Sequence, residues 1–289
     1  MSGTRDEDKT GQALRTQRFQ MLEDIARELT EDLVFPTHFD TSVRLREVLR
    51  LPDVPLQRVQ AAVTAEPLVS TRLIALANSA LYDRGGPPVR DIKTAIQKLG
   101  LEVVRTTATA IAMKQMLMAR DVAEFGDMTK RLWSHSLMTG AAAAVIARNF
   151  KRGTPDEALL AGLVHDLGAS YMLYRAAQYP ELRARPETTR HLVMQWHESV
   201  GVSLLHALGL PEEIVAATID HDQPRAVPEH PRNLADVVYV ANLMAGGHFE
   251  WLKMDFDAAA AKRAELGEGY TALIPEVKES VAELQAALG

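Results

Sequence analysis

The chain contains 289 residues, of which 47 % are hydrophobic and only 6 % are aromatic. This length can supply a sizeable buried core, and an abundance of Ala and Leu favours packed helices over sheets. The sequence has no cysteine, which excludes disulfides, thiolate metal sites and a cysteine nucleophile.

A formal net charge of −6 opposes direct binding of nucleic acid, because such binding depends on a concentrated basic face. The first twenty residues are polar and charged, and no run of about 18 apolar residues follows them. We therefore expect a cytoplasmic protein whose partners include neither a membrane nor DNA or RNA.

Residues 1–30 are expected to comprise a disordered start and one amphipathic helix. From Ala13 onward, apolar residues recur at steps of three and four, at Phe19, Leu22, Ile25, Leu29 and Leu33. The favoured interpretation is that this stripe packs onto its own domain, since surface helices usually bury their apolar face locally. Pairing in a homodimer and contact with an upstream receiver or sensor domain remain open alternatives.

Residues 31–118 form the first half of the predicted domain, which spans residues 31–248, and contain several short helices. One helix lies around residues 43–49, and later breaks occur at Glu66-Pro67, at residues 82–88 and at Leu99-Gly100. Asn78 and Ser79 are expected to end a helix and bond nearby backbone groups, and Gly100 to allow a tight turn. These three residues are interpreted as structural, with ligand binding as the lesser alternative.

Residues 119–248 form the second half of the domain, with helices expected around residues 131–149, 156–178, 190–208, 211–222 and 233–245. Gly209 and Pro211 are typical of the end of one helix and the start of the next. Residues 249–289 are expected to add C-terminal helices packed on the domain. Because no break is followed by a strand signal, the predicted fold class is all-α.

The candidate metal ligands lie in the second half, on or at the ends of these helices: His135, His165, Asp166, His197 and His221. For His165, Asp166, His197 and His221, the spacing from small and apolar neighbours directs the side chains inward. Imidazoles and a carboxylate that converge from separate helices suit iron, manganese or zinc, and such a metal can activate water. For any single histidine, however, a satisfied core or helix-end residue is the more frequent outcome. That interpretation is given to the remaining histidines, His38, His191, His206, His230 and His248.

Several motifs resemble the HDOD family, the HD-related output domain of bacterial signalling proteins. Residues 66–82 (EPLVSTRLIALANSALY) and 89–105 (VRDIKTAIQKLGLEVVR) resemble elements of the first half of that domain. In the second half, LWSHS, AGLVHDLG, HESVGVSLLHALGLPEEI and the pair His221-Asp222 occur in the family's order. The resemblance implies a multi-helix HDOD-like fold with a helical core like that of HD phosphohydrolases in the second half.

Similarity to HD phosphohydrolases also implies a ligand set, into which His135, His165, Asp166, His197 and His221 fit, with Asp222 and Asn242 as auxiliary residues. Asn242 stands where the last aspartate is expected, and a neutral amide is a poorer ligand than a carboxylate. Asp236 cannot replace it, because six residues along a helix turn the side chain by about 240°. The Lys that follows the His-Asp pair in many active relatives is also missing, and no Gly-Tyr-Pro follows His221.

We therefore favour a regulatory output module that acts through contacts with signalling proteins, and we assign no catalytic residue. Two alternatives stay open. The first is a metal-dependent phosphohydrolase acting on a nucleotide or cyclic dinucleotide, with His135, His165, Asp166 and His221 as ligands. The second is a metal or nucleotide sensor that uses the same site without turnover. The candidate cofactor is a divalent metal, namely Fe, Mn or Zn.

Overall fold

The computed structural model describes residues 11–30, 48, 54–82, 85–247 and 266–288, and these residues form helices and no strand. The predicted all-α fold class is thereby confirmed. The helix expected around residues 43–49 lies outside the described residues except for Val48, which is helical. Leu33, His38 and His248 also lie outside them. Within the described part of the chain, no helix is both long and apolar enough to cross a membrane.

The first half consists of short helices whose ends are set by proline, aspartate and glycine. They are α3 (Leu56–Thr64), α4 (Pro67–Ala77), the 3-10 helix η3 (Ala80–Tyr82), α5 (Ile92–Leu99) and α6 (Leu101–Leu117). Pro67 opens α4, where the missing backbone N–H costs no helical hydrogen bond. The Asp91 side chain caps α5 by accepting from the Thr94 backbone N–H at 2.9 Å. Gly100 joins α5 to α6 at a φ of 83°, which glycine adopts without strain.

Asn78 ties the end of α4 to the segment that precedes α5. Its Nδ2 donates to the carbonyls of Ile74 at 3.0 Å and Val89 at 2.8 Å, while its Oδ1 accepts from the Val89 N–H at 2.8 Å. The hydroxyl of Ser79 donates to the Leu76 carbonyl at 2.8 Å. These bonds all lie within the first half and hold its loop in place.

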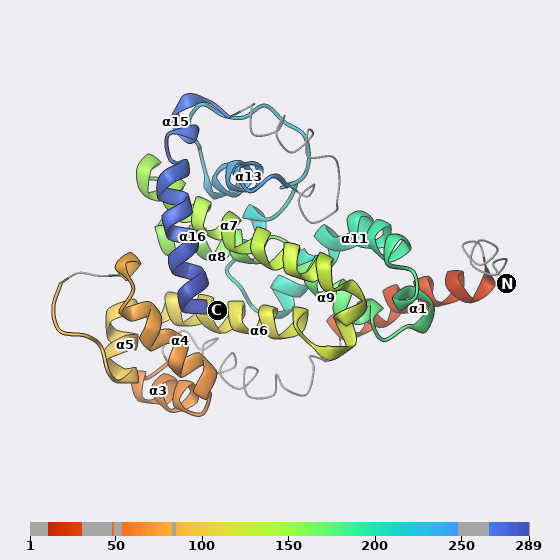
Figure 1. Cartoon of the computed structure of the whole chain (residues 1–289), viewed down its shortest axis with the longest axis horizontal. Coiled ribbons are helices and arrows are strands. Elements are labelled where there is room, and N and C mark those ends of the chain that lie inside the picture. Colours follow the sequence, from red (N-terminus) through yellow and green to blue (C-terminus); the bar gives the residue numbers. More distant parts are fainter. Residues whose placement is uncertain (1–10, 31–47, 49–53, 83–84, 248–265, 289) are drawn as a thin grey trace.

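The second half is built around α7. Its helices are η4 (Arg120–Phe125), α7 (Gly126–Phe150), α8 (Pro155–Val164), α9 (Leu167–Ala176), α10 (Pro180–Arg183), α11 (Pro186–Ala207), α12 (Glu212–Ala217) and α13 (Leu234–Met244). In Figure 1, α7 crosses the middle of the molecule, and it packs against α8 and α13. The buried alanines of α7, at positions 141–144 and 147, let these neighbours approach closely.

Glycines allow two very close helix contacts beside the candidate ligands. A Cβ added at Gly162 of α8 would lie 2.7 Å from the carbonyl oxygen of Thr139 on α7. A Cβ added at Gly168 of α9 would lie only 2.0 Å from the carbonyl oxygen of His197 on α11. Because any larger residue would force the backbones apart, these glycines bring α8 against α7 and α9 against α11.

Two predicted helices end earlier in the structure than expected. The helix expected at residues 156–178 is divided into α8 and α9 by a break at His165 and Asp166. The helix expected at residues 211–222 ends at Ala217, so His221 lies in the turn that follows α12 and not in a helical turn. Apolar residues continue on both sides of the first break, and no glycine or proline lies between Ala217 and His221, so the sequence gives no clear signal of either boundary. In the fold, Asp220 adopts a φ of 56°, which a right-handed helix cannot contain.

The N-terminal helix α1 (Gln12–Thr30) packs against α9, α10 and α11. Leu14, Met21 and Ile25 form its buried stripe, each at most 2 % exposed. Phe19 was expected on this stripe but is 65 % exposed. The described contacts of α1 therefore leave one large aromatic ring on its outer face.

The C-terminal segment adds the short helix α15 (Glu268–Thr271) and the longer helix α16 (Ile274–Leu288). Figure 1 shows α16 running from α15 across α7 toward the first half, and it packs against α7, α4 and α6. At its end, Arg72 of α4 and Lys114 of α6 donate to the last carbonyls of α16 at 3.3 Å. This helix therefore joins the two halves, and the two cations satisfy its terminal carbonyls.

Candidate functional site

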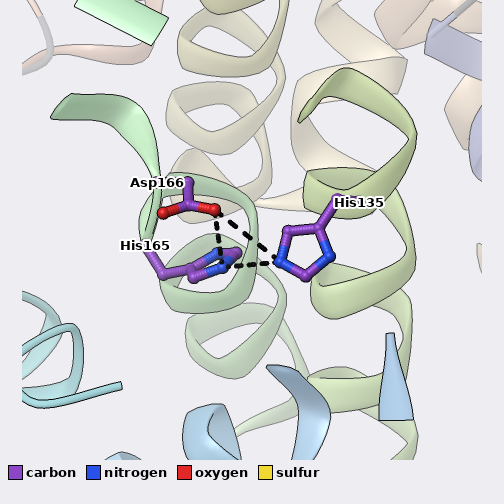
Figure 2. Close-up of side chains that lie close together, drawn as sticks. All are labelled: His135, His165 and Asp166. Atoms are coloured by element: carbon purple, nitrogen blue, oxygen red, sulfur yellow. Dashed lines mark hydrogen bonds and ion pairs between the residues drawn. The ribbon is translucent and has the colours of Figure 1, made fainter. Parts of the chain in front are cut away.

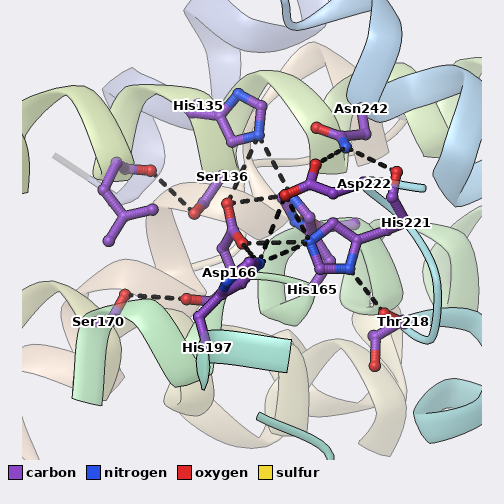
Figure 3. A network of polar contacts seen from close by, with 12 residues as sticks. His135, Ser136, His165, Asp166, Ser170, His197, Thr218, His221, Asp222 and Asn242 are labelled. Atoms are coloured by element: carbon purple, nitrogen blue, oxygen red, sulfur yellow. Dashed lines mark hydrogen bonds and ion pairs between the residues drawn. The ribbon is translucent and has the colours of Figure 1, made fainter. Parts of the chain in front are cut away.

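Five ligand-type side chains from four segments meet in the core of the second half (Figure 3). His135 lies on α7, His165 and Asp166 form the break between α8 and α9, His197 lies on α11, and His221 lies in the turn after α12. Their exposed fractions are between 1 % and 6 %. The structure thus brings together the five residues that the sequence analysis singled out.

His135, His165 and Asp166 form one group of donor atoms (Figure 2). The Nε2 atoms of the two histidines are 3.1 Å apart. Asp166 Oδ2 lies 3.3 Å from Nε2 of His165 and 3.7 Å from Nε2 of His135. Three donor atoms therefore face one point beside α7.

Asp166, His197 and His221 form a second group, which uses the other carboxylate oxygen. Oδ1 of Asp166 lies 3.5 Å from Nε2 of His197 and 3.3 Å from Nε2 of His221. These two Nε2 atoms are 3.4 Å apart. Asp166 therefore lies between the groups and presents one oxygen to each.

Backbone carbonyls determine which nitrogen three of the histidines present to the site. Nδ1 of His165 donates to the Gly162 carbonyl at 2.7 Å, and Nδ1 of His221 donates to the Thr218 carbonyl at 2.7 Å. Nδ1 of His197 likewise donates to the carbonyl of Val193, at 3.0 Å. Because a carbonyl can only accept, Nδ1 carries a proton in each of these rings, and Nε2 is the nitrogen that faces Asp166.

The donor set fits a divalent metal. When both rings are neutral, the Nε2 atoms of His197 and His221 direct lone pairs at each other over 3.4 Å, and these repel unless a proton or a metal ion lies between them. Adjacent ligand atoms of an ion bound at about 2.1 Å are about 3.0 Å apart in octahedral and about 3.4 Å apart in tetrahedral geometry. The distances within both groups are close to these values. Imidazole with carboxylate suits zinc, iron or manganese.

Comparison with models of known protein families identifies the family of this chain. A family model described as the HDOD domain matches residues 35–224, which is more than half of the sequence. The chain belongs to the HDOD family. The HDOD match includes all five converging residues, whereas Asn242 lies beyond its end.

Relatives with solved structures share the HDOD fold over nearly the whole chain. A protein from Shewanella amazonensis SB2B, provisionally described as a metal-dependent phosphohydrolase, has a TM-score of 0.67 and 24 % identity, with 95 % of this chain and 100 % of that chain covered. An HDOD domain protein of unknown function from Geobacter sulfurreducens has a TM-score of 0.56 and 23 % identity, with 95 % and 98 % covered.

One curated relative is an uncharacterized protein of Treponema pallidum (strain Nichols), which is 25 % identical over 245 residues. The match covers 80 % of this chain but only 45 % of the relative, so this chain spans less than half of that protein. At these identities the two solved structures establish the fold alone.

In this site, burial and neighbouring charges act on the pKa values of the buried side chains. Burial, reinforced by His165, lowers the pKa of His135 to about 4. Burial also acts to lower the pKa of His221, but Asp222 and Asp166 outweigh it and raise that pKa to about 10. Burial acts to raise the pKa of Asp166, yet His165 and His221 hold it well below its usual range. Asp166 therefore stays ionised and requires a positive charge beside it.

Two auxiliary residues border the site on the side of His221. Asp222 Oδ2 lies 3.4 Å from Nε2 of His197 and 3.7 Å from Nε2 of His221. Nδ2 of Asn242 donates to Asp222 Oδ1 at 2.9 Å and to the His221 carbonyl at 3.0 Å. The site therefore contains a second carboxylate, and Asn242 of α13 reaches it through Asp222 (Figure 3).

The structure places other polar candidates away from this site. Asp236 is buried at the start of α13, where it pairs with Arg232 at 2.8 Å and Arg225 at 3.3 Å. His206 pairs with Glu212 near the surface at 3.1 Å. The remaining described histidines make local contacts: His191 with the Glu187 carbonyl, and His230 with the Phe150 ring.

Sequence reasoning identified the ligand-type residues but not what positions them. The carbonyls of Gly162, Val193 and Thr218 orient three imidazoles, and nothing in their residue types indicates that role. The contact of Asp222 with His197 joins segments 25 residues apart and has no local signal either. The small residues beside the ligands are the one usable signal, because glycines such as Gly168 permit close helix contacts.

Proposed function

We propose that this HDOD protein is a regulatory module whose second half holds divalent metal at the two groups of donor atoms, and that the metal acts by fixing the arrangement of the helices around it. The observation that carries the proposal is the convergence of four Nε2 atoms on the two oxygens of Asp166. Without a cation, this set of buried lone pairs and one buried charge is costly. With a cation, the same atoms become its ligands.

Burial supports a regulatory role over hydrolysis. His135, His165, His221 and Asp166 are each at most 2 % exposed, which leaves little surface on which a substrate could reach a bound ion. Asn242 is uncharged, so α13 brings no carboxylate to the centre. An enclosed ion of this kind would stabilise the helices that supply its ligands.

Helix α9 provides a route from the metal centre to the N-terminal helix. It begins next to Asp166, and its middle and far end contact Glu28 of α1 through Tyr171 and Arg175. The Tyr171 hydroxyl donates to Glu28 Oε2 at 2.7 Å, and Arg175 Nη2 pairs with Glu28 Oε1 at 2.8 Å. We infer that metal occupancy is coupled through α9 to α1, where a signalling partner or an upstream domain would be contacted.

Metal analysis of the full chain, purified without chelator, tests the proposal. The protein is expected to retain Fe, Mn or Zn, whereas His165→Ala and Asp166→Ala should lose it. His206→Ala is the matched control, because this imidazole is exposed and paired with Glu212. Stripping the metal should lower the melting temperature by roughly 5 to 10 °C, as expected for a ligand present at about 100 times its Kd. A metal-free wild-type protein that melts identically with and without added metal would contradict the proposal.

A metal-dependent phosphohydrolase is the second candidate, and one observation favours it. Asp166 presents a separate oxygen to each histidine group, the arrangement expected of a carboxylate shared by two ions, and paired ions are common in phosphoester hydrolysis. Protein loaded with Mn or Fe should be offered a panel of nucleotides and cyclic dinucleotides. Metal retention without phosphate release supports the regulatory module, whereas release that is abolished in Asp166→Ala supports the hydrolase.

A further inference from the structure

We infer that Asp222 supplies a second carboxylate ligand to the metal centre, and that Asn242 is the positioning residue that aims it. This inference rests on the proposed metal site and adds to it a ligand and its support. Asp222, in the turn after α12, would then supply the carboxylate that Asn242 of α13 does not.

The position of Asp222 points to a ligand. Its Oδ2 lies 3.4 Å from Nε2 of His197 and 3.7 Å from Nε2 of His221, close to the 3.5 Å and 3.3 Å that separate Asp166 Oδ1 from the same two atoms. The Asp222 side chain is 15 % exposed, whereas that of Asp166 is 1 % exposed. Asp222 is therefore the carboxylate on the more accessible side of the His197–His221 group.

Asn242 engages the other oxygen of Asp222. Its amide nitrogen donates to Asp222 Oδ1 and to the His221 carbonyl, at 2.9 Å and 3.0 Å. Rotating the amide would place its oxygen against two acceptors, so these contacts determine its orientation. With Oδ1 bonded to the amide, Oδ2 is the oxygen left facing the histidines.

The same contacts explain why an amide suits position 242. An ionised carboxylate there would have no N–H to donate, and it would lie against both the Asp222 carboxylate and the His221 carbonyl. A carboxylate at position 222 is therefore compatible with an amide at position 242. Carboxylates at both positions would repel each other unless a further cation lay beside them. Two divalent ions also carry a charge of +4, which Asp166 and Asp222 together offset better than Asp166 alone.

Titration of the chelator-stripped full chain with Co²⁺, followed by visible absorption and by metal analysis, tests the inference. Wild-type protein is expected to bind two ions. We call the ion at His135, His165 and Asp166 the first ion, and the ion at Asp166, His197 and His221 the second ion. Asp222→Asn preserves the shape of the side chain and removes its charge. It should weaken binding of the second ion by roughly tenfold or more and leave binding of the first ion unchanged. Asp220→Asn is the control, because Asp220 is an exposed neighbour whose φ of 56° asparagine tolerates.

Asn242→Ala should weaken the same ion, and Asn242→Gln, which keeps the amide, should recover part of the loss. His135→Ala should show the opposite pattern and weaken binding of the first ion only, because His135 belongs to the first donor group alone. Circular dichroism and melting in chelator establish that each variant is folded before the titrations are compared. If Asp222→Asn binds both ions like the Asp220→Asn control, the inference is wrong while the metal site stands. If wild-type protein binds no Co²⁺, both proposals are wrong.

Discussion

Gly168 and Gly201 contact each other across α9 and α11, yet we expect the same substitution to have very different effects at the two positions. In Gly168→Ala the new Cβ would lie 2.0 Å from the His197 carbonyl oxygen and 2.5 Å from the Gly201 nitrogen. Side-chain Cβ atoms essentially never approach other atoms to within 3.0 Å, so α9 must move by about 1 Å, the difference between 3.0 Å and 2.0 Å. In Gly201→Ala the nearest atom is 3.4 Å away, which is ordinary contact.

The magnitudes separate the two variants clearly. Forcing a methyl group between packed backbones costs about 3 kcal/mol, and the better helix propensity of Ala returns about 1 kcal/mol. Gly168→Ala should therefore lose about 2 kcal/mol of unfolding free energy and roughly 4 to 8 °C in melting temperature. Gly201→Ala keeps the propensity gain and should melt at or slightly above the wild-type temperature.

Thermal and urea unfolding of the metal-stripped chain, followed by circular dichroism at 222 nm, would measure both variants. Gly168 adjoins the Asp166 break, so metal retention by Gly168→Ala should also fall, whereas Gly201→Ala should retain metal. Equal melting temperatures for the two variants would refute the reasoning, because the close contact would then be relieved without cost.

Three further predictions concern buried polar contacts. Asp236→Asn should lose about 1 to 3 kcal/mol in urea unfolding without loss of metal, because it breaks the pair with Arg232. Burial acts to raise the pKa of Asp236, but the Arg232 guanidinium outweighs it and lowers that pKa. The stability difference between wild type and Asp236→Asn should therefore be full at neutral pH and shrink as the pH falls below about 3.9, the ordinary aspartate value. A difference that stays constant with pH would contradict the ion pair. Asn78→Ala should cost about 2 kcal/mol in the same assay, since it leaves the backbone of Val89 unpaired, and an unchanged midpoint would exclude a structural role. Glu28→Gln should speed proteolytic cleavage near α1, and unchanged cleavage would count against the contact between α1 and α9.

Most helices could be predicted from the sequence, because their signals are local. Pro67 and Pro186 lie in the first turns of α4 and α11, and the Thr154-Glu157 capping box opens α8. The divided helix at residues 156–178 could not be predicted, because apolar side chains continue through the break. In the fold, the break at His165 and Asp166 lies between α8, which packs on α7, and α9, which packs on α11.

Ala and Leu content, helical periodicity and helix-ending residues by themselves determined that this chain is all-helical with inward-facing histidines, and its motifs resemble those of the HDOD family. Only the tertiary structure decided that the two oxygens of Asp166 face different histidine groups, that three backbone carbonyls turn the imidazoles toward them, and that Asp222 and Asn242 border the site. The physical reason is range: periodicity and capping act over a few residues, whereas ligand geometry depends on contacts between segments far apart in the chain, made where glycines let helices touch.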